Sequence, residues 1–284
     1  MLMSKLGIIT DEVSPHLEEA LDFATDHGLT HVEIRTVEGR NAIDLSDEEL
    51  KRVHTAVQRR GLFVSCFSSP VFKCALDVNR AVQVGDVFSD KGGGVEEHFH
   101  KLTRAIEIAR QLRTRNVRIF SFWREFHPEE HTAEIVQYLK QAAALAMRHD
   151  VMLLLENEPA CNAGYASEVN TFVCIIDSPA LKALWDPGNE AYGLREAFPS
   201  GYQAIKQTVE HVHLKDVRID EFGKPHCVPI GSGIVPYDLQ LKALHDDGYN
   251  GLFTLEPHYI PQGGTAKDGS ELTLKGLLRK DYDG

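Results

Sequence analysis

Short apolar runs typical of buried strands alternate with longer amphipathic runs typical of helices along the whole chain. The first pair is a strand expected at Leu6–Thr10 and a helix expected from about Pro15 to His27, with Gly28 where a helix cap belongs. Parallel strands need such crossover helices, and eight of them can close into a barrel without a free edge. The alternation therefore predicts an α/β fold, a (β/α)₈ TIM barrel in a single domain over residues 1–284.

The alternation continues to the end of the chain. Ser46 to Glu49 reads as a capping box that opens a helix, because the two side chains can satisfy each other's backbone groups. An open doubly wound sheet is the competing fold, but residues 7–12 lack the glycine-rich turn that usually marks it. The further strands are expected at 32–35, 62–67, 117–120, 151–156, 183–186, 211–216 and 252–256, and the further helices at 95–113, 130–149, 167–176, 202–208, 237–246 and 271–279.

Residues 68–94 form the longest stretch without either pattern, and they end in three consecutive glycines. The stretch follows the third expected strand, so in a barrel it lies on the face where active sites of this fold are found. It is either a lid over the substrate or an insertion without catalytic meaning. A helical tail is expected at about 265–284.

Composition excludes several classes of protein. The net charge of −12, from 30 Lys and Arg against 42 Asp and Glu, argues against nucleic acid as a partner, because phosphates require clustered cations. The five cysteines are odd in number and include no CxxC pair, which argues against a disulfide framework or a thiolate zinc site. The chain shows no secretory segment and no apolar run of about 18 residues, so a cytoplasmic protein without a membrane partner is expected.

Four consecutive expected strands end in a carboxylate or an imidazole. Because the C-terminal ends of the strands meet at one mouth of a barrel, these side chains are expected to converge. Alternation along the strand predicts that His213 and Lys215 face the barrel interior. The four residues are Glu156, Asp186, His213 and Glu256.

A single strand-end carboxylate is more often a helix cap or an ion-pair partner than a metal ligand, and Asp186 before Pro187 and Gly188 also reads as a turn. Four such residues with only oxygen and nitrogen donors favour a site for one divalent metal ion. Three carboxylates and one imidazole suit Mn, Mg, Co or Zn, and the donor set does not select among them. The alternative is a non-catalytic barrel in which the four residues coincide by chance.

Several segments resemble the signature segments of the xylose-isomerase-like TIM barrel superfamily: LLLENEP, ALWDPGN, HVHLKD, IGSGIVPYDL and FTLEPH. The resemblance covers most of the chain, and the superfamily includes ketose 3-epimerases, inosose-type isomerases and dehydratases, and AP endonucleases. It implies that Glu156, Asp186, His213 and Glu256 bind the metal. It also implies that Glu156 and Glu256 are the catalytic acid/base pair, and it allows a homo-oligomer.

A metal site of this kind can support proton transfer next to a carbonyl. A divalent cation that chelates the carbonyl and a neighbouring hydroxyl stabilises the enediolate, while two carboxylates on opposite sides of the sugar remove and return the proton. The leading hypothesis is therefore a metal-dependent isomerase or epimerase whose substrate is a small-molecule sugar or cyclic polyol.

Departures from the resembling ketose 3-epimerases keep a second hypothesis open. Those enzymes have a substrate-contacting histidine and a substrate-contacting glutamate where this chain has Asn189 and Asn162. Their loss favours a lyase or dehydratase that eliminates a β-substituent from a keto-sugar or keto-inositol. A third hypothesis, an AP endonuclease-type DNA repair enzyme, needs extra histidines that this chain lacks after strands two to four and six.

Further polar and aromatic residues at the expected mouth are predicted to bind substrate. Trp123 would either stack on the apolar face of a sugar or close the end of the barrel. Lys215 would either pair with Asp216 or polarise a substrate oxygen, with His211 as its partner. The complete predicted set is Asn189, Arg218, Trp123, Lys215, Glu33 and His258.

Overall fold

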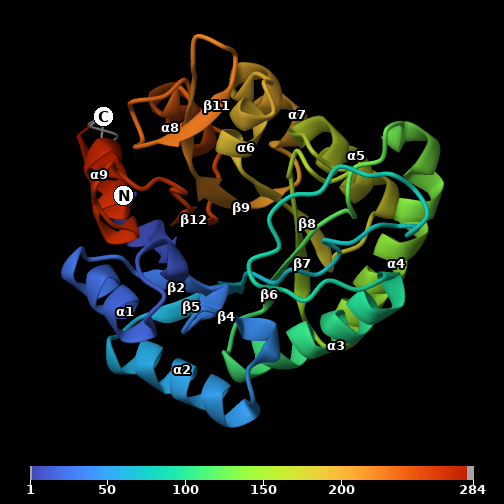
Figure 1. Ribbon diagram of the computed structural model, residues 1–284, viewed down its shortest axis with the longest axis horizontal. Helices are drawn as coiled ribbons and strands as arrows, with labels where there is room; N and C mark the ends of the chain where they lie inside the picture. Colours follow the sequence, from blue (N-terminus) through green and yellow to red (C-terminus); the bar gives the residue numbers. More distant parts are fainter. Residues whose placement is uncertain (1, 280–284) are drawn as a thin grey trace.

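The computed structural model describes residues 2–279 of the chain. Eight parallel strands close into a barrel in which β1 (Leu6–Ile9) pairs with both β2 (His31–Ile34) and the last strand, β12 (Leu252–Leu255). Helices surround this barrel, and the N-terminal segment lies beside the last helix (Figure 1). The predicted (β/α)₈ barrel is therefore confirmed.

The remaining elements follow the predicted order. The other barrel strands are β5 (Phe63–Phe67), β6 (Asn116–Ile119), β7 (Met152–Glu156), β8 (Leu181–Trp185) and β9 (Val209–Leu214). The main helices are α1 (Leu17–Asp26), α2 (Asp47–Arg59), α3 (Val95–Gln111), α4 (Thr132–Arg148), α5 (Ala166–Ile176), α7 (Tyr202–Ile205), α8 (Tyr237–Asp246) and α9 (Ala266–Leu278).

The second helix forms as its sequence predicts. The hydroxyl of Ser46 accepts the N–H of Glu49, and the carboxylate of Glu49 accepts the N–H of Ser46, so the capping box is present. Leu50, Val53 and Val57 are buried on one side of α2 and belong to the main hydrophobic core. A capped start and one apolar face therefore fix where α2 begins and how it packs.

The structure departs from the prediction after the seventh barrel strand. The expected strand at 211–216 ends at Leu214, because the hydroxyl of Tyr237 accepts the N–H of Lys215 and donates to its carbonyl. The chain then turns into an antiparallel hairpin of β10 (Asp216–Ile219) and β11 (Pro225–Val228).

Three other departures are smaller. A short hairpin of β3 (Thr36–Val37) and β4 (Arg40–Asn41) follows β2, and the six-residue helix α6 (Pro187–Tyr192) follows β8. The last helix starts at Ala266 rather than at 271, because Thr265 caps it. Residues 280–284 of the predicted tail lie outside the described part of the chain.

Residues 68–94 form a long loop between β5 and α3 that contains no helix and only an isolated bridge. The loop passes in front of β6, β7 and β8 (Figure 1). It is held at its end, where Lys101 lies 2.7 Å from the carboxylate of Asp90, and Asn41 donates to the carbonyl of Phe88 at 3.0 Å. The loop therefore lies over the C-terminal face of the barrel.

Burial differs between the two sides of the barrel wall. Outward-facing side chains such as Ile8 and Val212 are fully buried in the main hydrophobic core between strands and helices. Several inward-facing side chains are instead polar, and Glu33, Arg118 and His211 are each at most 1% exposed. Because buried polar groups need partners, this polar interior forms a hydrogen-bonded network. No helix within residues 2–279 is both long and apolar enough to cross a membrane.

Candidate metal centre

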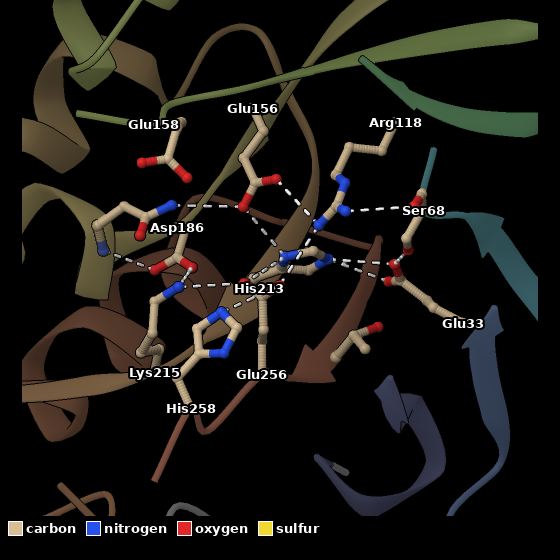
Figure 2. A network of polar contacts seen from close by, with 12 residues as sticks. Glu33, Ser68, Arg118, Glu156, Glu158, Asp186, His213, Lys215, Glu256 and His258 are labelled. Carbon is tan, nitrogen blue, oxygen red and sulfur yellow. Dashed lines mark hydrogen bonds and ion pairs between the residues drawn. The ribbon is translucent and has the colours of Figure 1, made fainter. Parts of the chain in front are cut away.

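The four strand-end residues converge at the C-terminal mouth of the barrel. Each is at most 2% exposed, and each offers one potential ligand atom that lies within 4.8 Å of those of the other three (Figure 2). One ion can therefore contact all four side chains. We call them the four-residue cluster: Glu156 at the end of β7, Asp186 after β8, His213 in β9 and Glu256 after β12.

The hydrogen bonding of the four-residue cluster is incomplete. Glu156 Oε2 lies 3.2 Å from Arg118 and Asp186 Oδ2 lies 2.8 Å from Lys215, but the buried His213 Nδ1 makes no hydrogen bond. An unsatisfied buried polar group costs about 1–3 kcal/mol, so such atoms are rare. A divalent cation that prefers oxygen and nitrogen ligands would satisfy this nitrogen and bind the carboxylate oxygens beside it. The residues present therefore fit such an ion.

The orientation of His213 also fits an ion. Its Nδ1 lies 3.4 Å from Glu156 Oε1 and 3.4 Å from Glu256 Oε2, whereas its Nε2 lies 3.2 Å from both oxygens of Glu33 (Figure 2). Glu33 also lies 2.7 Å from Nε2 of His211. A carboxylate that accepts the Nε2–H leaves Nδ1 free for a cation, as is usual for metal-binding histidines. Glu33 thus contacts two histidines, and its binding of substrate stays a prediction.

Two buried arginines face the same carboxylates, although neither was singled out from the sequence. Arg118, in β6, places Nη1 3.2 Å from Glu156 Oε2 and 3.4 Å from Glu256 Oε1. Arg35, directly after β2, places Nη1 2.8 Å from Glu256 Oε1 and Nη2 2.5 Å from Glu12 Oε1. An arginine within an apolar strand sequence is the signal that points to Arg118, because its neighbours in β6 face outward.

Lys215 lies among the carboxylates but does not form the predicted pair. Its Nζ is 2.8 Å from Asp186 Oδ2 and 3.1 Å from Glu256 Oε2. The carboxylate of Asp216 instead accepts backbone N–H groups of the loop that follows β11, so the predicted pair of Lys215 with Asp216 is wrong. The prediction that His211 is a partner of Lys215 is also wrong, because His211 contacts Glu33 and Thr254 on the far side of His213.

Two of the other predicted substrate contacts lie beside the four-residue cluster. Asn189 Nδ2 is 3.4 Å from Glu156 Oε1, and Asn189 N–H donates to Asp186 Oδ1 at 2.8 Å. His258 Nε2 is 3.6 Å from Glu256 Oε1. The side chain of His258 is 31% exposed, so it marks the open edge of an otherwise buried site.

Trp123 and Arg218 lie apart from the four-residue cluster. Trp123 is 6% exposed and packs with Phe120, Ala160 and Cys161, and its contact with substrate stays a prediction. Arg218 is exposed on the β10–β11 hairpin, and no hydrogen bond or ion pair joins it to the cluster within residues 2–279. The arginines that reach the site come instead from β6 and the end of β2.

The protonation of the carboxylates is set by burial and by nearby charge. Burial raises the pKa of Asp186 above its ordinary value, and Lys215 offsets this only in part. Burial acts on Glu256 in the same direction, but Lys215 and other cations hold its pKa well below the usual range. Burial likewise opposes ionisation of Glu156, yet Arg118 lowers its pKa. Glu156 and Glu256 are therefore ionised at neutral pH, as a ligand or a base must be.

Two further groups of potential ligands overlap with the four-residue cluster: Glu33 with His211 and His213, and Glu12 with Glu256 and His258. Their members already bind one another, since His211 Nε2 lies 2.7 Å from Glu33 and His258 Nδ1 lies 2.9 Å from Glu12. The four-residue cluster offers four ligand atoms and includes His213 Nδ1, which makes no hydrogen bond, so it is the better candidate for an ion.

Comparison with known proteins identifies the family. A family model described as xylose isomerase-like TIM barrel matches residues 21–276. The chain belongs to this family. No curated protein sequence matches it.

Solved structures of xylose isomerase-like barrels superpose on nearly the whole chain. A probable 3-DHS dehydratase, AsbF of Bacillus anthracis, is 19% identical with a TM-score of 0.73, over 98% of this chain and 99% of that chain. The IolI protein with a bound zinc atom is 18% identical with a TM-score of 0.75, over 97% of both chains. The 3-keto-D-glucoside 4-epimerase YcjR of E. coli is 13% identical with a TM-score of 0.69, over 97% and 98%. Identities this low show a common fold rather than a common activity.

Proposed function

We propose that this protein is a divalent-metal-dependent isomerase or epimerase that moves a proton next to the carbonyl of a sugar or cyclic polyol. The observation that carries the proposal is the gathering of four potential ligand atoms within 4.8 Å of one another, beside a buried His213 Nδ1 that makes no hydrogen bond. The likeness to an IolI structure with bound zinc and to a 3-keto-D-glucoside 4-epimerase supports it.

Glu156 and Glu256 are the proposed acid/base pair. When bound, a divalent cation would supply Lewis-acid stabilisation of the negative charge that develops on the substrate oxygens. Both carboxylates are held ionised, so either can accept the proton from carbon, and the carboxylic acid formed in this way can return a proton to the substrate. Return from the opposite face uses the other carboxylate after it has taken a proton from solvent. Arg118 contacts both carboxylates through the same Nη1 and thereby keeps them directed at one space.

The surroundings of the proposed acid/base pair favour this chemistry. Glu156 and Glu256 are each 2% exposed, and Arg118 and Lys215 beside them are 1% and 3% exposed. Fixed cations in a space that excludes water stabilise developing negative charge far better than the same groups in solvent. Arg118 and Lys215 are therefore proposed to stabilise the charge that the proton leaves behind.

A lyase is the second candidate, and the position of Lys215 favours it. Its Nζ lies between Asp186 Oδ2 and Glu256 Oε2, at 2.8 and 3.1 Å, next to a proposed base. A base that removes the proton and an ammonium group that protonates a departing oxygen are together sufficient for β-elimination. The likeness to a probable 3-DHS dehydratase also supports this candidate.

The endonuclease hypothesis has less support. A multi-metal centre of that kind needs histidine ligands from the loops after β2, β5, β6 and β8. Within the described residues, the candidate ligand groups contain no histidine from those loops. The net charge of −12 also opposes binding to a phosphate backbone.

One experiment separates the proposals. The Mn²⁺-loaded protein is incubated in D₂O with D-fructose, a keto-inositol and a 3-keto-glucoside, and the mixtures are followed by NMR. We expect deuterium to enter the carbon next to the carbonyl without loss of a group. Release of water or of the aglycone, with a new conjugated ketone, would assign elimination instead. A protein that binds one Mn²⁺ per chain but exchanges no proton of any ketone would overturn both proposals.

A further inference from the structure

The phenyl ring of Phe88, on the long loop after β5, is surrounded by basic side chains from distant parts of the chain. Its centroid lies 4.1 Å from Cζ of Arg35, 4.7 Å from Nζ of Lys73 and 5.9 Å from Cζ of Arg118. The ring of His258 stacks on it, with centroids 5.9 Å apart and an angle of 11°. Cation–π contacts of significant energy occur about once per 70–80 residues, so three on one ring form an exceptional concentration.

Lys73 is the least compensated of these basic groups. It is 1% exposed, and its Nζ donates to the carbonyl of Asp86 at 2.8 Å. Its carboxylate partner is Glu158, at 3.5 Å, and the rings of Phe120 and Trp123 lie 4.4 and 5.9 Å from the ammonium. A buried ammonium with one long ion pair and aromatic neighbours is poorly compensated for its lost hydration.

Not all N–H donors of Arg118 are used in hydrogen bonds. Its Nε–H has no partner, and its Nη2 donates to the carbonyl of Ser68 at 3.2 Å. Its Nη1 relies on Glu156 and Glu256, whose oxygens are the proposed ligands of the metal. Arg35 and His258 differ, because each is already paired with Glu12.

We propose that the substrate bears a carboxylate, and that Arg118 and Lys73 bind this carboxylate in the space that the ring of Phe88 fills. The proposal deepens the proposed function and rests on it for the rest of the substrate, a hydroxylated ring or chain with a keto group. The face of a phenyl ring is a weak substitute for an anion. A carboxylate would give both cations charge-assisted hydrogen bonds, which are about twice as strong as neutral ones.

Replacement of the ring requires movement of the loop at Phe88. Phe88 and Ser89 both have left-handed backbone conformations, with φ of 47° and 61°. Non-glycine residues in sparsely populated conformations cost roughly 1–3 kcal/mol each, and their release favours a rearranged loop. The carboxylate of the substrate therefore displaces a phenyl ring that is held in place by strained backbone, and the strain makes this displacement easier.

Binding by inert acids tests the proposal without relying on catalysis. Quinate is compared with its methyl ester, and gluconate with gluconamide, by calorimetry on the Mn²⁺-loaded protein. None of the four has a ketone, and loss of the negative charge is the main change within each pair, since the ester adds only a methyl group and the amide only exchanges an oxygen for NH₂. We expect at least one acid to bind tenfold or more tightly than its neutral counterpart. Equal affinities within both pairs, or no binding by either acid, would refute the carboxylate subsite.

Variants locate the subsite. Lys73→Met and Arg118→Lys are expected to reduce the preference for the acid at least fivefold. Lys206→Met, which removes a lysine paired with Asp247 away from the mouth, should leave it unchanged. Phe88→Ala is expected to tighten binding of the acid, because the ring no longer competes. A preference that survives in Lys73→Met with intact folding would contradict the assignment.

The two proposals fail in different ways. If the protein binds the acids more tightly than their neutral counterparts but exchanges no proton of any ketone, the carboxylate subsite is supported. The isomerase and lyase proposals are then refuted. Proton exchange with a neutral ketose, without any charge preference in the inert pairs, would do the reverse.

Discussion

Glu33 shows how one buried side chain can prepare another for an ion. It faces Nε2 of His213 and Nε2 of His211, so it can accept the Nε2–H of His213 and leave Nδ1 for a cation. Loss of such a partner typically lowers metal affinity by about 10–100-fold. Glu33→Gln is therefore expected to weaken binding of Mn²⁺ or Zn²⁺ by that factor in a calorimetric titration. The fold should be retained.

The control for this variant is another buried carboxylate. Glu125 is 5% exposed and pairs with Arg80 at 3.1 Å, outside the four-residue cluster. Glu125→Gln should leave the metal affinity unchanged. Equal affinities in Glu33→Gln and the unmodified protein would show that Glu33 has only a structural role.

At the residue scale, the sequence predicts the position of those side chains that stand at the end of a barrel strand, because the order of the strands fixes where they meet. Glu156 and Glu256 end apolar strands, so their convergence needed only the barrel. Arg35 could not be predicted in the same way, because its contacts to Glu12 and Glu256 join opposite ends of the chain. Arg218 shows the limit of spacing, since its distance in sequence from His213 does not reveal the hairpin on which it lies, and its contact with substrate stays a prediction.

At the scale of elements, α6 and the end of β9 are joined by a close backbone contact. A Cβ atom on Gly188 would lie 2.4 Å from the carbonyl oxygen of Lys215. Gly188→Ala is therefore expected to reduce the free energy of unfolding by about 1–3 kcal/mol, because the backbone must shift. Denaturant unfolding measures this loss. Gly94→Ala is the control, since nothing lies within 4 Å of its added Cβ and its φ is −87°.

A result in which both glycine variants are equally stable would show that the contact can relax freely. Displacement of Lys215 should accompany the loss in Gly188→Ala. Metal affinity should then fall as well, because the Nζ of Lys215 lies 2.8 Å from Asp186.

The long loop is attached to α3 through a buried histidine. His98 is fully buried, and its Nδ1 accepts the N–H of Phe72 at 2.9 Å. Burial lowers the pKa of His98 from 6.5 to about 4. The unfolded chain therefore binds a proton at a higher pH than the folded chain does. The contribution of neutral His98 is complete above about pH 6.5 and is lost as the pH falls toward 4.

His98→Gln tests this linkage, because glutamine can accept the same N–H but does not titrate. We expect the stability of the unmodified protein to fall more steeply than that of the variant between pH 6.5 and 4. Urea unfolding at several pH values gives both slopes. Parallel slopes would mean that His98 is not the titrating group.

Elements with a strong local pattern were predictable, and those made by distant contacts were not. The capping box of Ser46 and the apolar face of α2 lie within one segment, so the helix was found. The β10–β11 hairpin instead depends on Asp216, which accepts N–H groups from Gly231 and Gly233. Helix α6 has six residues, too few to show a helical period.

At the scale of the whole molecule, metal binding should stabilise the fold. A ligand at a hundred times its Kd adds about 2.7 kcal/mol, and each kcal/mol raises Tm by roughly 2–4 °C in a protein of about this size. Saturating Mn²⁺ is therefore expected to raise Tm by about 5–10 °C over the EDTA-treated protein. Calorimetry measures the change.

Asp186→Asn should abolish the metal-dependent part of this shift while keeping the helix cap, because asparagine can still accept the N–H of Asn189. A Tm that does not respond to Mn²⁺, Mg²⁺, Co²⁺ or Zn²⁺ would contradict the proposed centre.

The overall architecture could be read from the sequence because it is built from units that are local in the chain. Each strand packs beside its sequence neighbour, apart from the closure of β1 onto β12. That closure brings Glu12 to His258, whose N–H donates to its carboxylate at 2.7 Å. No local pattern encodes such a contact.

The four candidate ligands and the proposed carboxylate subsite come from different halves of the chain. The four candidate ligands come from β7 onward, whereas Lys73, Phe88 and Arg118 all precede α4. A single crossover within α4 would join the half of this protein that carries the candidate ligands to the first half of a relative. Such hybrids would keep the four candidate ligands but would receive the relative's residues in place of Glu33 and Arg118, which contact those ligands from the first half. Substrate selectivity could then change without loss of the centre only where both parents carry these two contacts.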